Sequence, residues 1–431
     1  MNKKILREVV LEQERDRKTA DPGIARSCLS DISKYIRVPH AVVISGIRRS
    51  GKSTLLTQIL NKYYEKGVYC FNFEDERLMD FEVDDFNGLY EIFLEIYGDK
   101  KVFFFDEIQN VTGWESFVRR MQGKGFKFFI TGSNASLLSK ELGTKLTGRC
   151  ISIELYPFSF DEFLHFKGHE VVKNAFSYTA ERSAIRRYFA EYLRHGGMPE
   201  YLKYKDVTLL KRVYEDILYR DIVARYDIRQ VKALRELGLY LLSNIGNLFS
   251  YNGLKNVLGV KSMNTVKSYA DYMENSFLML LVGKFSYSLK QQFVANKKAY
   301  CIDNGLAESV AFQFSQNKGK FLENLVAVEL KRRNSEMYYY KTANSLEVDF
   351  MVKNGRKDIM LVQVSDNIDN EKTRQREVGA LERAMDELKT HKALILTEDT
   401  EEEIKSGSKI IYVKPVYKWL LERTKMRGDN A

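Results

Sequence analysis

The first third of the chain alternates short apolar runs with stretches of helical periodicity. The runs lie at Ala41–Ile44, Val68–Phe73, Val102–Phe105, Phe126–Thr131 and Ile151–Leu155. After the first of them, Leu55, Leu56, Ile59 and Leu60 recur with the period of an α-helix. Apolar strands separated by helices are typical of a mostly parallel sheet that is covered on both faces. The pattern therefore predicts an α/β domain.

The pattern after residue 160 changes twice. Residues 160 to 245 have helical periodicity and few strand signals. Residues 246–290 indicate helix, short turn, helix and two apolar strands, and the second helix carries one apolar stripe of Val266, Tyr269, Ala270 and Met273. Beyond residue 295, strands are predicted at Ala299–Ile302, Val348–Val352, Ile359–Val364 and Ala393–Thr397, with helices at Phe321–Arg333 and Glu377–Thr390. This last part is predicted to be a second α/β domain.

These patterns divide the chain into five predicted segments. They are an N-terminal helical segment at 1–35, an α/β domain at 36–165, a helical region at 166–245, a winged-helix-like domain at 246–295 and a second α/β domain at 296–431. In the first segment Ile5, Val9 and Val10 fall at helical spacing, and Leu6 widens that face. Gly/Ser-rich linkers are absent and five prolines are present, so we expect the domains to pack together.

The composition is that of a well-packed globular protein. Hydrophobic residues make up 44% and aromatic residues 13% of the 431 residues, which argues against disorder. The net charge of +10 favours an anionic partner such as a nucleotide, a nucleic acid or an acidic protein surface, although a basic protein without such a partner is equally compatible. The four cysteines have no zinc-ligand spacing, the N-terminus has no apolar leader, and apolar runs such as Phe277–Val282 are too short to span a bilayer. We therefore expect a cytoplasmic protein with no membrane partner.

Residues 46–54 carry the most specific motif in the chain. They read Gly46-Ile47-Arg48-Arg49-Ser50-Gly51-Lys52-Ser53-Thr54 and match G-x-x-x-x-G-K-[ST] between a predicted strand and a predicted helix. The glycines let the backbone curl so that successive N–H groups point at phosphate oxygens, and the following helix presents its positive end to the same anion. Lys52 adds a charge near the β- and γ-phosphates, the Ser53 hydroxyl is a hard ligand for Mg²⁺, and Thr54 is expected near the α-phosphate. These nine residues are predicted to bind ATP, with Mg²⁺ as the metal cofactor.

A pair of carboxylates follows the third apolar run. Asp106 and Glu107 come directly after Phe105, at the carboxyl edge of the predicted sheet, where ligands of open α/β sheets bind. We expect Asp106 to hold Mg²⁺ together with Ser53, and Glu107 to orient or deprotonate the water that attacks the γ-phosphate. Two solvated carboxylates that cap a strand are the alternative, and the nearby phosphate-binding motif argues against it.

Three further residues are candidates for catalysis. Ser133 and Asn134 follow the fourth apolar run, and either could contact the γ-phosphate or the attacking water from the neighbouring strand. A turn that caps a helix at Leu137–Leu142 is an equal alternative for them. Arg149 could reach a phosphate as an arginine finger, in its own chain or in a neighbouring one, or could be a surface arginine beside a turn.

Several stretches together resemble one protein family. They are Ile44–Thr54, Phe105–Gln109, Thr131–Ser133, Leu146–Arg149, Tyr156–Phe158, Gly196–Glu200, Arg220–Ile222, Tyr300–Leu306 and Phe321–Asn324. The chain is similar, over nearly its whole length, to prokaryotic AAA-type ATPases of the archaeal-ATPase kind with a C-terminal DUF4143 domain. The resemblance implies a P-loop NTPase with an AAA/ASCE-type parallel sheet, followed by a helical and winged-helix region and a restriction-endonuclease-like α/β domain. AAA-type sites often lie between subunits, so a homo-oligomer or another protein partner is compatible with it, and the sequence decides neither.

The resemblance also implies a position for a nuclease-like metal centre in the last domain. In restriction-endonuclease-like domains an Asp on one strand and a Glu/Gln-x-Lys on the next hold a metal. Asp349 fits the first position, Glu347 lies on the same face because strand residues alternate, and Gln363 fits the second. Ser365 stands where the lysine is expected, and Glu323 could add a carboxylate. Without the lysine we expect this domain to be impaired or inactive as a nuclease.

The sequence thus predicts an ATP hydrolase that acts as a molecular switch or motor. One alternative is a nucleic-acid-binding module gated by ATP, because a winged-helix domain can place its second helix in the major groove of DNA. Asp271 on the exposed side of that helix, and the scarcity of arginine there, favour a structural or protein-contact role instead. A degenerate nuclease is the other alternative.

Overall fold

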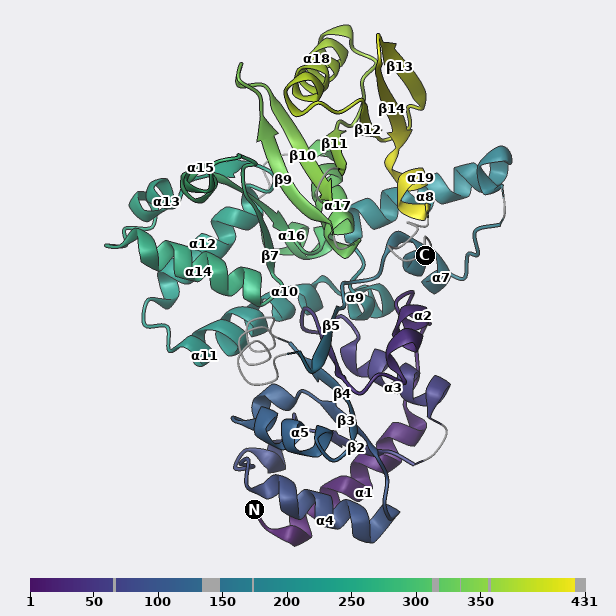
Figure 1. Cartoon of the computed structure of the whole chain (residues 1–431), viewed down its shortest axis with the longest axis vertical. Helices are drawn as coiled ribbons and strands as arrows, with labels where there is room; N and C mark the ends of the chain where they lie inside the picture. Colours follow the sequence, from purple (N-terminus) through teal and green to yellow (C-terminus); the bar gives the residue numbers. More distant parts are fainter. Residues whose placement is uncertain are drawn as a thin grey trace. The chain divides into compact units, whose positions relative to one another are not determined.

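The computed structural model describes residues 1–64, 67–133, 148–172, 174–311, 318–333, 335–355 and 358–422. The chain folds into two compact units, each with its own sheets (Figure 1). One unit consists of Met1–Tyr156 with the short segment Asn275–Phe277, and the other begins at Pro157. Residues 157–165, which the sequence pattern assigns to the first domain, therefore lie in the second unit.

A parallel sheet of five strands forms the centre of the first unit. The strands are β1 (Ala41–Ser45), β2 (Tyr69–Asn72), β3 (Val102–Asp106), β4 (Lys127–Gly132) and β5 (Cys150–Glu154). They are hydrogen-bonded in the order β2-β3-β4-β1-β5, and every neighbouring pair is parallel. The strand β4 separates β1 from β3, so the carboxyl ends of these three strands lie side by side. The predicted parallel sheet is confirmed.

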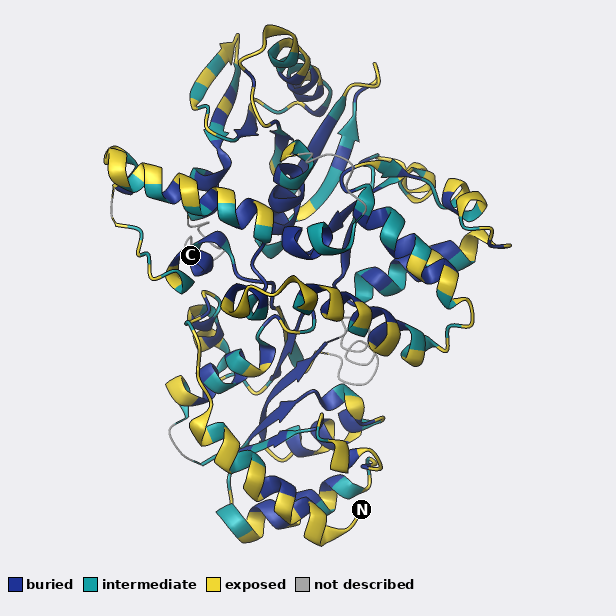
Figure 2. Cartoon of the chain, turned by 180° about the vertical axis from the view of Figure 1, so that it is seen from behind, coloured by how far each residue is buried: buried dark blue, intermediate teal, exposed yellow. Residues whose placement is uncertain are grey.

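Helices cover both faces of this sheet, which explains why its strands are continuous apolar runs. Val42 and Ile44 of β1 pack in one apolar cluster with α3 (Lys52–Tyr63), whereas Val43 packs on the opposite face. That face is covered by α1 (Lys3–Thr19), α4 (Asp85–Tyr97) and α5 (Trp114–Gln122). Short helices lie in the connections, namely α2 (Leu29–Ile32), η1 (Ser33–Tyr35), η2 (Glu76–Leu78) and η3 (Ile108–Asn110). Figure 2 shows the strands as a buried layer between helices with exposed outer sides.

The N-terminal helix α1 belongs to the first unit. Its apolar face is formed by Leu6, Val9 and Val10, whereas Ile5 is 37% exposed, so the expected position of Ile5 on that face is wrong. Gln13 of this helix pairs with Asn72 at the end of the edge strand β2. The Gln13 amide donates to the Asn72 carbonyl and accepts from its N–H, both at 2.9 Å. This contact satisfies backbone groups that an edge strand otherwise leaves open.

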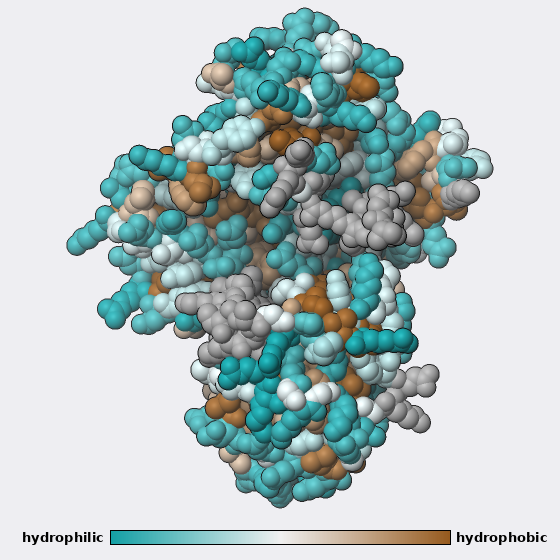
Figure 3. Space-filling view, in the orientation of Figure 1, coloured by the Kyte–Doolittle hydropathy of each residue, from teal (hydrophilic) through white to brown (hydrophobic). Residues whose placement is uncertain are grey.

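Helices make up the second unit from residue 157 to residue 245, as predicted. They are α7 (Phe160–Phe166), η4 (Ala175–Ser177), α8 (Thr179–His195), α9 (Pro199–Tyr204), α10 (Val207–Asp216), the π-helix η5 (Ile217–Val223), α11 (Ala224–Tyr226) and α12 (Val231–Ser243). None of the helices in the described ranges of the chain is both long and apolar enough to cross a lipid bilayer. The face seen in Figure 3 carries mostly hydrophilic side chains, with hydrophobic ones in small scattered groups.

An antiparallel sheet of three strands follows these helices. The strands β6 (Leu248–Phe249), β7 (Met279–Val282) and β8 (Lys297–Cys301) pair in the order β6-β8-β7. The helices α13 (Tyr251–Val257) and α14 (Met263–Asn275) precede β7, and α15 (Leu289–Val294) lies between β7 and β8 in the sequence. The predicted stripe of α14 is buried. The sequence pattern places β8 in the last domain, but the structure pairs β8 with β6 and β7, so the expected boundary at residue 295 falls within this sheet.

A mixed sheet of six strands completes the second unit. The strands are β9 (Glu336–Lys341), β10 (Glu347–Asn354), β11 (Asp358–Val364), β12 (Lys392–Thr397), β13 (Glu402–Ser406) and β14 (Lys409–Pro415), in the order β13-β14-β12-β11-β10-β9. The accompanying helices are α16 (Asn304–Val310), α17 (Lys318–Arg332), α18 (Glu371–Leu388) and α19 (Val416–Leu421). The predicted second α/β fold is confirmed. The hydrophobic pattern of the sequence does not predict β9, β13 and β14, because these strands carry charged residues and are only partly buried.

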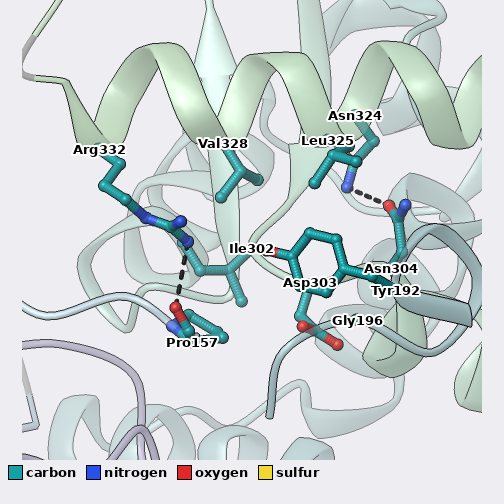
Figure 4. Close-up of a pocket in the computed structure, with 10 residues that line it drawn as sticks. All are labelled: Pro157, Tyr192, Gly196, Ile302, Asp303, Asn304, Asn324, Leu325, Val328 and Arg332. Atoms are coloured by element: carbon teal, nitrogen blue, oxygen red, sulfur yellow. Dashed lines mark hydrogen bonds between the residues drawn. The ribbon is translucent and has the colours of Figure 1, made fainter. Parts of the chain in front are cut away.

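A buried joint of the second unit brings together three segments with no evident chemistry, namely Gly196–Glu200, Tyr300–Leu306 and Phe321–Asn324 (Figure 4). One carboxylate oxygen of Asp303 caps α16 by accepting the N–H of Leu306 at 3.0 Å, and the other accepts the N–H of Gly197 at 2.7 Å. Gly196 has φ +69°, and an added Cβ would lie 2.2 Å from the Asp303 carboxylate. The backbone of the Gly196–Gly197 turn therefore approaches Asp303 too closely for any side chain.

Two asparagines complete this joint. The Asn304 amide donates to the carbonyl of Leu193 at 2.7 Å, and the Asn324 amide donates to Asn304 Oδ1 at 2.7 Å. Arg332 donates to the carbonyl of Pro157 at 3.1 Å (Figure 4). The cavity between these groups has a volume of about 10 Å³, room for one water molecule at most. The joint thus holds α8 against α16 and α17, and it is too small to bind a ligand.

Gly196→Ala tests the role of this joint in stability. The matched control is Gly168→Ala, because Gly168 has φ +72° and an added Cβ there would meet no described atom within 4 Å. Both alanines carry the strain of a positive φ, and the backbone of Gly196, with φ +69° and ψ −164°, lies in a region that is almost confined to glycine. We expect Gly196→Ala to lower the free energy of unfolding of the second unit by about 2 kcal/mol more than the control, because it also displaces Asp303. Denaturant unfolding followed by circular dichroism measures this, and equal losses would contradict the assignment.

Candidate functional site

The loop Gly46–Gly51 connects the end of β1 to the start of α3. Gly46 has φ +157°, and an added Cβ would lie 2.1 Å from the carbonyl oxygen of Leu155, so glycine is required. Gly51 has φ +94° and directly precedes Lys52, the first residue of α3. The loop therefore curls at the carboxyl edge of the parallel sheet and leads into a helix N-terminus.

A buried arginine outside the motif braces this loop. The Arg26 side chain donates to the carbonyl oxygen of Ser50 at 2.8 Å and to that of Tyr156 at 2.6 Å. Its backbone N–H donates to the Gln58 side chain on α3 at 3.2 Å. Arg26 thus ties the loop to the segment after β5 and to α3. No motif of the sequence points to Arg26, because this residue lies in an N-terminal segment that was expected to be separate from the sheet.

Lys52 lies beside the predicted acidic pair. It is 4% exposed, and its Nζ lies 3.3 Å from the carbonyl oxygen of Ile47 and 3.6 Å from Oε1 of Glu107. The ammonium group is therefore shared between the loop after β1 and the carboxylate after β3. A cation this deeply buried requires such partners, because burial removes its hydration.

Asp106 ends β3 and is also buried, at 8% exposure. The Thr131 hydroxyl on β4 donates to its carboxylate, and the Ser53 hydroxyl lies close enough to lower its pKa. Burial and the neighbouring charge of Glu107 raise the pKa of Asp106 above its ordinary value, although both hydroxyls and Lys52 oppose the shift. The structure therefore brings together Ser53 and Asp106, the two residues predicted to hold a metal.

Glu107 is held by two residues that the sequence analysis did not select. Its backbone is left-handed, with φ +49°, and its N–H donates to Oγ1 of Thr131 at 2.9 Å. The Gln109 amide donates to the Glu107 carboxylate and lies 3.4 Å from Oγ of Ser133. Thr131 thus binds both Asp106 and Glu107, while Gln109 links Glu107 to the predicted residue Ser133. Thr131 and Gln109 lie within the segments Thr131–Ser133 and Phe105–Gln109, which resemble the family. Their position in these segments was the signal that could have identified them.

The other predicted residues of the loop have different surroundings. Ile47 and Ser50 are buried, Thr54 is half-buried, and Arg49 and Ser53 are exposed. Arg48 forms an ion pair with Glu74, with a distance of 3.2 Å between NH1 and Oε1. The backbone of Arg49 is left-handed, with φ +62°, which lets the loop turn at that point.

Two predicted catalytic residues remain, Asn134 and Arg149. Asn134 and the helix expected at 137–142 lie outside the described residues. Arg149 precedes β5, and its carbonyl oxygen accepts the N–H of Ala41 at 2.9 Å, at the amino end of β1. The loop leaves from the opposite end of β1, about 13 Å away along the strand. The expectation that Arg149 reaches a phosphate of its own chain is therefore wrong, whereas a role in a neighbouring chain stays a prediction.

The arrangement places an anion site next to a cation site. The curled backbone, the N-terminus of α3 and Lys52 all favour negative charge in front of the loop. The Ser53 hydroxyl and the Asp106 carboxylate are hard oxygen donors, which Mg²⁺ prefers. The Glu107 carboxylate lies beside them and can accept a proton. These residues fit a phosphate-bearing ligand together with Mg²⁺.

Protein-family models match three consecutive regions of the chain. Residues 38–164 match an AAA domain (AAA_14), which is the region that contains the loop and the acidic pair. Residues 186–317 match a domain of unknown function (DUF8612), and residues 318–419 match another (DUF4143).

Two relatives are similar to nearly the whole chain. The uncharacterized protein MJ1544 of Methanocaldococcus jannaschii is 37% identical over 405 residues, 89% of this chain and 89% of that protein. An uncharacterized protein of Haemophilus influenzae is 32% identical over 394 residues, 88% of this chain and 94% of that protein. Among solved structures, the Walker-type ATPase paby2304 of Pyrococcus abyssi is 15% identical with a TM-score of 0.41, covering 66% of this chain and 95% of that chain.

Thr131→Val tests the hydrogen bonds at the end of β4. Valine keeps the shape but removes a partner of the Asp106 carboxylate and of the Glu107 N–H, so we expect the free energy of unfolding of the first unit to fall by about 1–3 kcal/mol. The control is Thr19→Val at the exposed end of α1, where the hydroxyl donates to the Asp16 carbonyl of the same helix. Thermal unfolding combined with hydrogen exchange in β3 and β4 measures the difference. A variant as stable as the control would show that these bonds contribute nothing.

Proposed function

This chain belongs to the family of AAA-domain proteins that includes MJ1544 of Methanocaldococcus jannaschii, and on that premise we propose that its first unit binds ATP with Mg²⁺ and hydrolyses it. Membership of residues 38–164 in the AAA domain family supports nucleotide binding. The local geometry of the site supports the requirement for Mg²⁺ and the hydrolysis step.

One observation carries the proposal, namely that the loop and the acidic pair meet. Lys52 lies 3.6 Å from Glu107, and the Ser53 hydroxyl lies close to Asp106. These four side chains come from two segments that are joined to strands on either side of β4. A site that merely held a nucleotide would not need Glu107 beside the metal ligands, so its presence favours hydrolysis.

In the proposed mechanism the loop binds the phosphates. The N–H groups of Gly46–Gly51 and the Lys52 ammonium hold the phosphate oxygens. Ser53 and Asp106 would hold Mg²⁺, which when bound neutralises part of the triphosphate charge. Lys52 exchanges its contact with Glu107 for a contact with phosphate. The Glu107 carboxylate, released from the ammonium, then accepts a proton from the attacking water.

Two neighbours position these groups in the proposed mechanism. Thr131 fixes the Asp106 carboxylate and the backbone of Glu107, so it sets the separation between metal ligand and base. Gln109 orients the Glu107 carboxylate, and Ser133 beside it lies where it can contact the attacking water. Neither Thr131 nor Gln109 needs to touch the nucleotide for this role.

We propose that hydrolysis changes the arrangement of the helical and winged-helix-like parts, so that the chain works as a switch or motor. The second candidate is a nucleic-acid-binding module gated by ATP. It is favoured by the net charge of +10 and by the exposed residues Lys261, Asn264 and Lys267 around the start of α14.

Lys52→Ala and Glu107→Gln separate binding from hydrolysis. We expect Lys52→Ala to weaken ATP binding at least about 10-fold, because a charge–phosphate contact is lost. Glu107→Gln should bind ATP as the wild type does but turn over at least about 100-fold more slowly, because the proton acceptor is gone. Lys62→Ala, exposed on the same helix, and Glu95→Gln, exposed on α4, are the matched controls. Calorimetry and phosphate release measure both steps, and a Glu107→Gln protein with wild-type turnover would refute the mechanism.

Turnover with and without duplex DNA distinguishes the two candidates. Gated binding predicts that ATP changes the affinity for DNA and that this affinity falls steeply with salt. Lys261→Ala combined with Lys267→Ala should then reduce DNA binding while turnover without DNA stays unchanged. Absence of binding at low salt, with and without ATP, would exclude the DNA-linked candidate and leave the switch or motor intact.

A further inference from the structure

Lys298 lies at the centre of a cluster of carboxylates in the second unit, of which Glu323 and Asp349 are buried and the Glu347 side chain is 31% exposed. Lys298 stands on β8 and is 1% exposed. Its ammonium nitrogen lies 2.9 Å from an oxygen of Glu323, 2.9 Å from Glu347 and 3.0 Å from Asp349. Glu323 belongs to α17, whereas Glu347 and Asp349 belong to β10. One ammonium group thus joins the three-stranded sheet, α17 and the six-stranded sheet.

This cluster contains the residues expected to form a nuclease-like metal centre. Glu323, Glu347 and Asp349 are brought together, as that expectation requires, but the expectation that the centre has no lysine is wrong. Ser365 replaces the lysine next to β11, whereas Lys298 brings an ammonium group from a different strand. No sequence pattern could reveal this, because Lys298 lies about 50 residues before Asp349 in the chain.

Gln363, the fourth expected ligand, is engaged elsewhere. Its Oε1 accepts the N–H of Asp349 at 3.1 Å, and its Nε2 donates to the Glu377 carboxylate at 2.7 Å. The second oxygen of Asp349 accepts the N–H of Val364 at 3.0 Å. These bonds fix the amide and the carboxylate as parts of the sheet structure and leave them poorly placed to bind a metal.

The charges of the cluster cancel without a metal. Besides Lys298, the ammonium group of Lys320 lies 3.0 Å from Glu323, and that of Lys341 lies 3.5 Å from Glu347. Among the described side chains, three ammonium groups therefore face three carboxylates. A divalent cation would add two positive charges to a group that is already neutral, next to the buried ammonium of Lys298, where like charges repel strongly.

Lys298 is held in its charged form. Burial disfavours the ammonium, but three carboxylates within 3.0 Å of its nitrogen replace the lost hydration. Gly246, before β6, packs on the same cluster, since its carbonyl accepts from Lys320 at 3.1 Å and an added Cβ would lie 2.9 Å from Glu323. The backbone before β6 thus covers the cluster at Glu323, while the Glu347 side chain keeps 31% of its surface exposed.

We propose that the ammonium group of Lys298 is the resident cation of this centre, in place of a divalent metal. The carboxylates of a nuclease-like site then serve to join the two sheets of the second unit, and the centre has no metal-dependent nuclease activity. A metal that used the same oxygens would compete with Lys298, because the ammonium already lies within 3.0 Å of all three carboxylates.

Manganese binding to the full chain tests this directly. Mn²⁺ is titrated without nucleotide and followed by electron paramagnetic resonance, in a Ser53→Ala background so that the first unit does not contribute. We expect no bound Mn²⁺ that depends on Asp349, and no cleavage of plasmid DNA by the wild type with Mn²⁺. Bound Mn²⁺ that is lost in Asp349→Asn and Glu347→Gln variants, each with unchanged circular dichroism, would overturn the proposal.

Lys298→Ala gives the complementary test, with Lys297→Ala on the same strand as the matched control. Leaving three carboxylates without their cation should lower the midpoint of thermal unfolding by about 10 °C relative to the control. With both variants in the Ser53→Ala background, Mn²⁺ should raise the midpoint of Lys298→Ala and leave the control unchanged. A Lys298→Ala protein as stable as the control, or one that Mn²⁺ does not stabilise, would contradict the proposal. If this variant does not fold, the titration of the full chain decides.

Discussion

The burial of opposite charges at the carboxyl edge of a parallel sheet is the constraint on which the first unit depends. With β4 between β1 and β3, the loop after β1 and the acidic pair after β3 converge around the end of β4. Neither Lys52 nor Asp106 could be buried alone, because each would lose its hydration without a partner. Thr131 at the end of the intervening strand supplies hydrogen bonds to both acidic residues. The groups that stabilise this edge are therefore the groups that a magnesium nucleotide would use.

The second unit also surrounds a buried lysine with oxygen atoms, but this lysine has more and shorter ion pairs. Lys298 has three carboxylates within 3.0 Å, whereas Lys52 has a carbonyl at 3.3 Å and a carboxylate at 3.6 Å. An incoming anion can compete for Lys52, because its present contacts are long and few. An incoming anion cannot compete in the same way for Lys298, whose ammonium is buried in a neutral cluster. The number and the length of the ion pairs thus distinguish a lysine that can exchange its partners for a ligand from a lysine with a structural role.

Several motifs of the second unit turn out to serve packing. Asp303 receives backbone N–H groups from two segments that are more than 100 residues apart, and Gly196 lacks a side chain because Asp303 occupies that space. Such residues look functional in a sequence, since polar and glycine residues in short motifs are typical of binding sites. Their geometry shows that a buried polar joint imposes equally strict requirements, because each buried donor and acceptor needs a partner.

The sequence by itself determined the parallel sheet, the glycine loop and the placement of a carboxylate pair at a strand end, because each depends on residues that are neighbours in the chain. Apolar runs report burial, and the spacing of Gly46, Gly51 and Lys52 reports the local backbone. Only the tertiary structure decided that Arg26 braces the loop and that Lys298 enters the carboxylate cluster. Contacts between residues so distant in the chain follow from strand order and helix packing, and no local pattern encodes these.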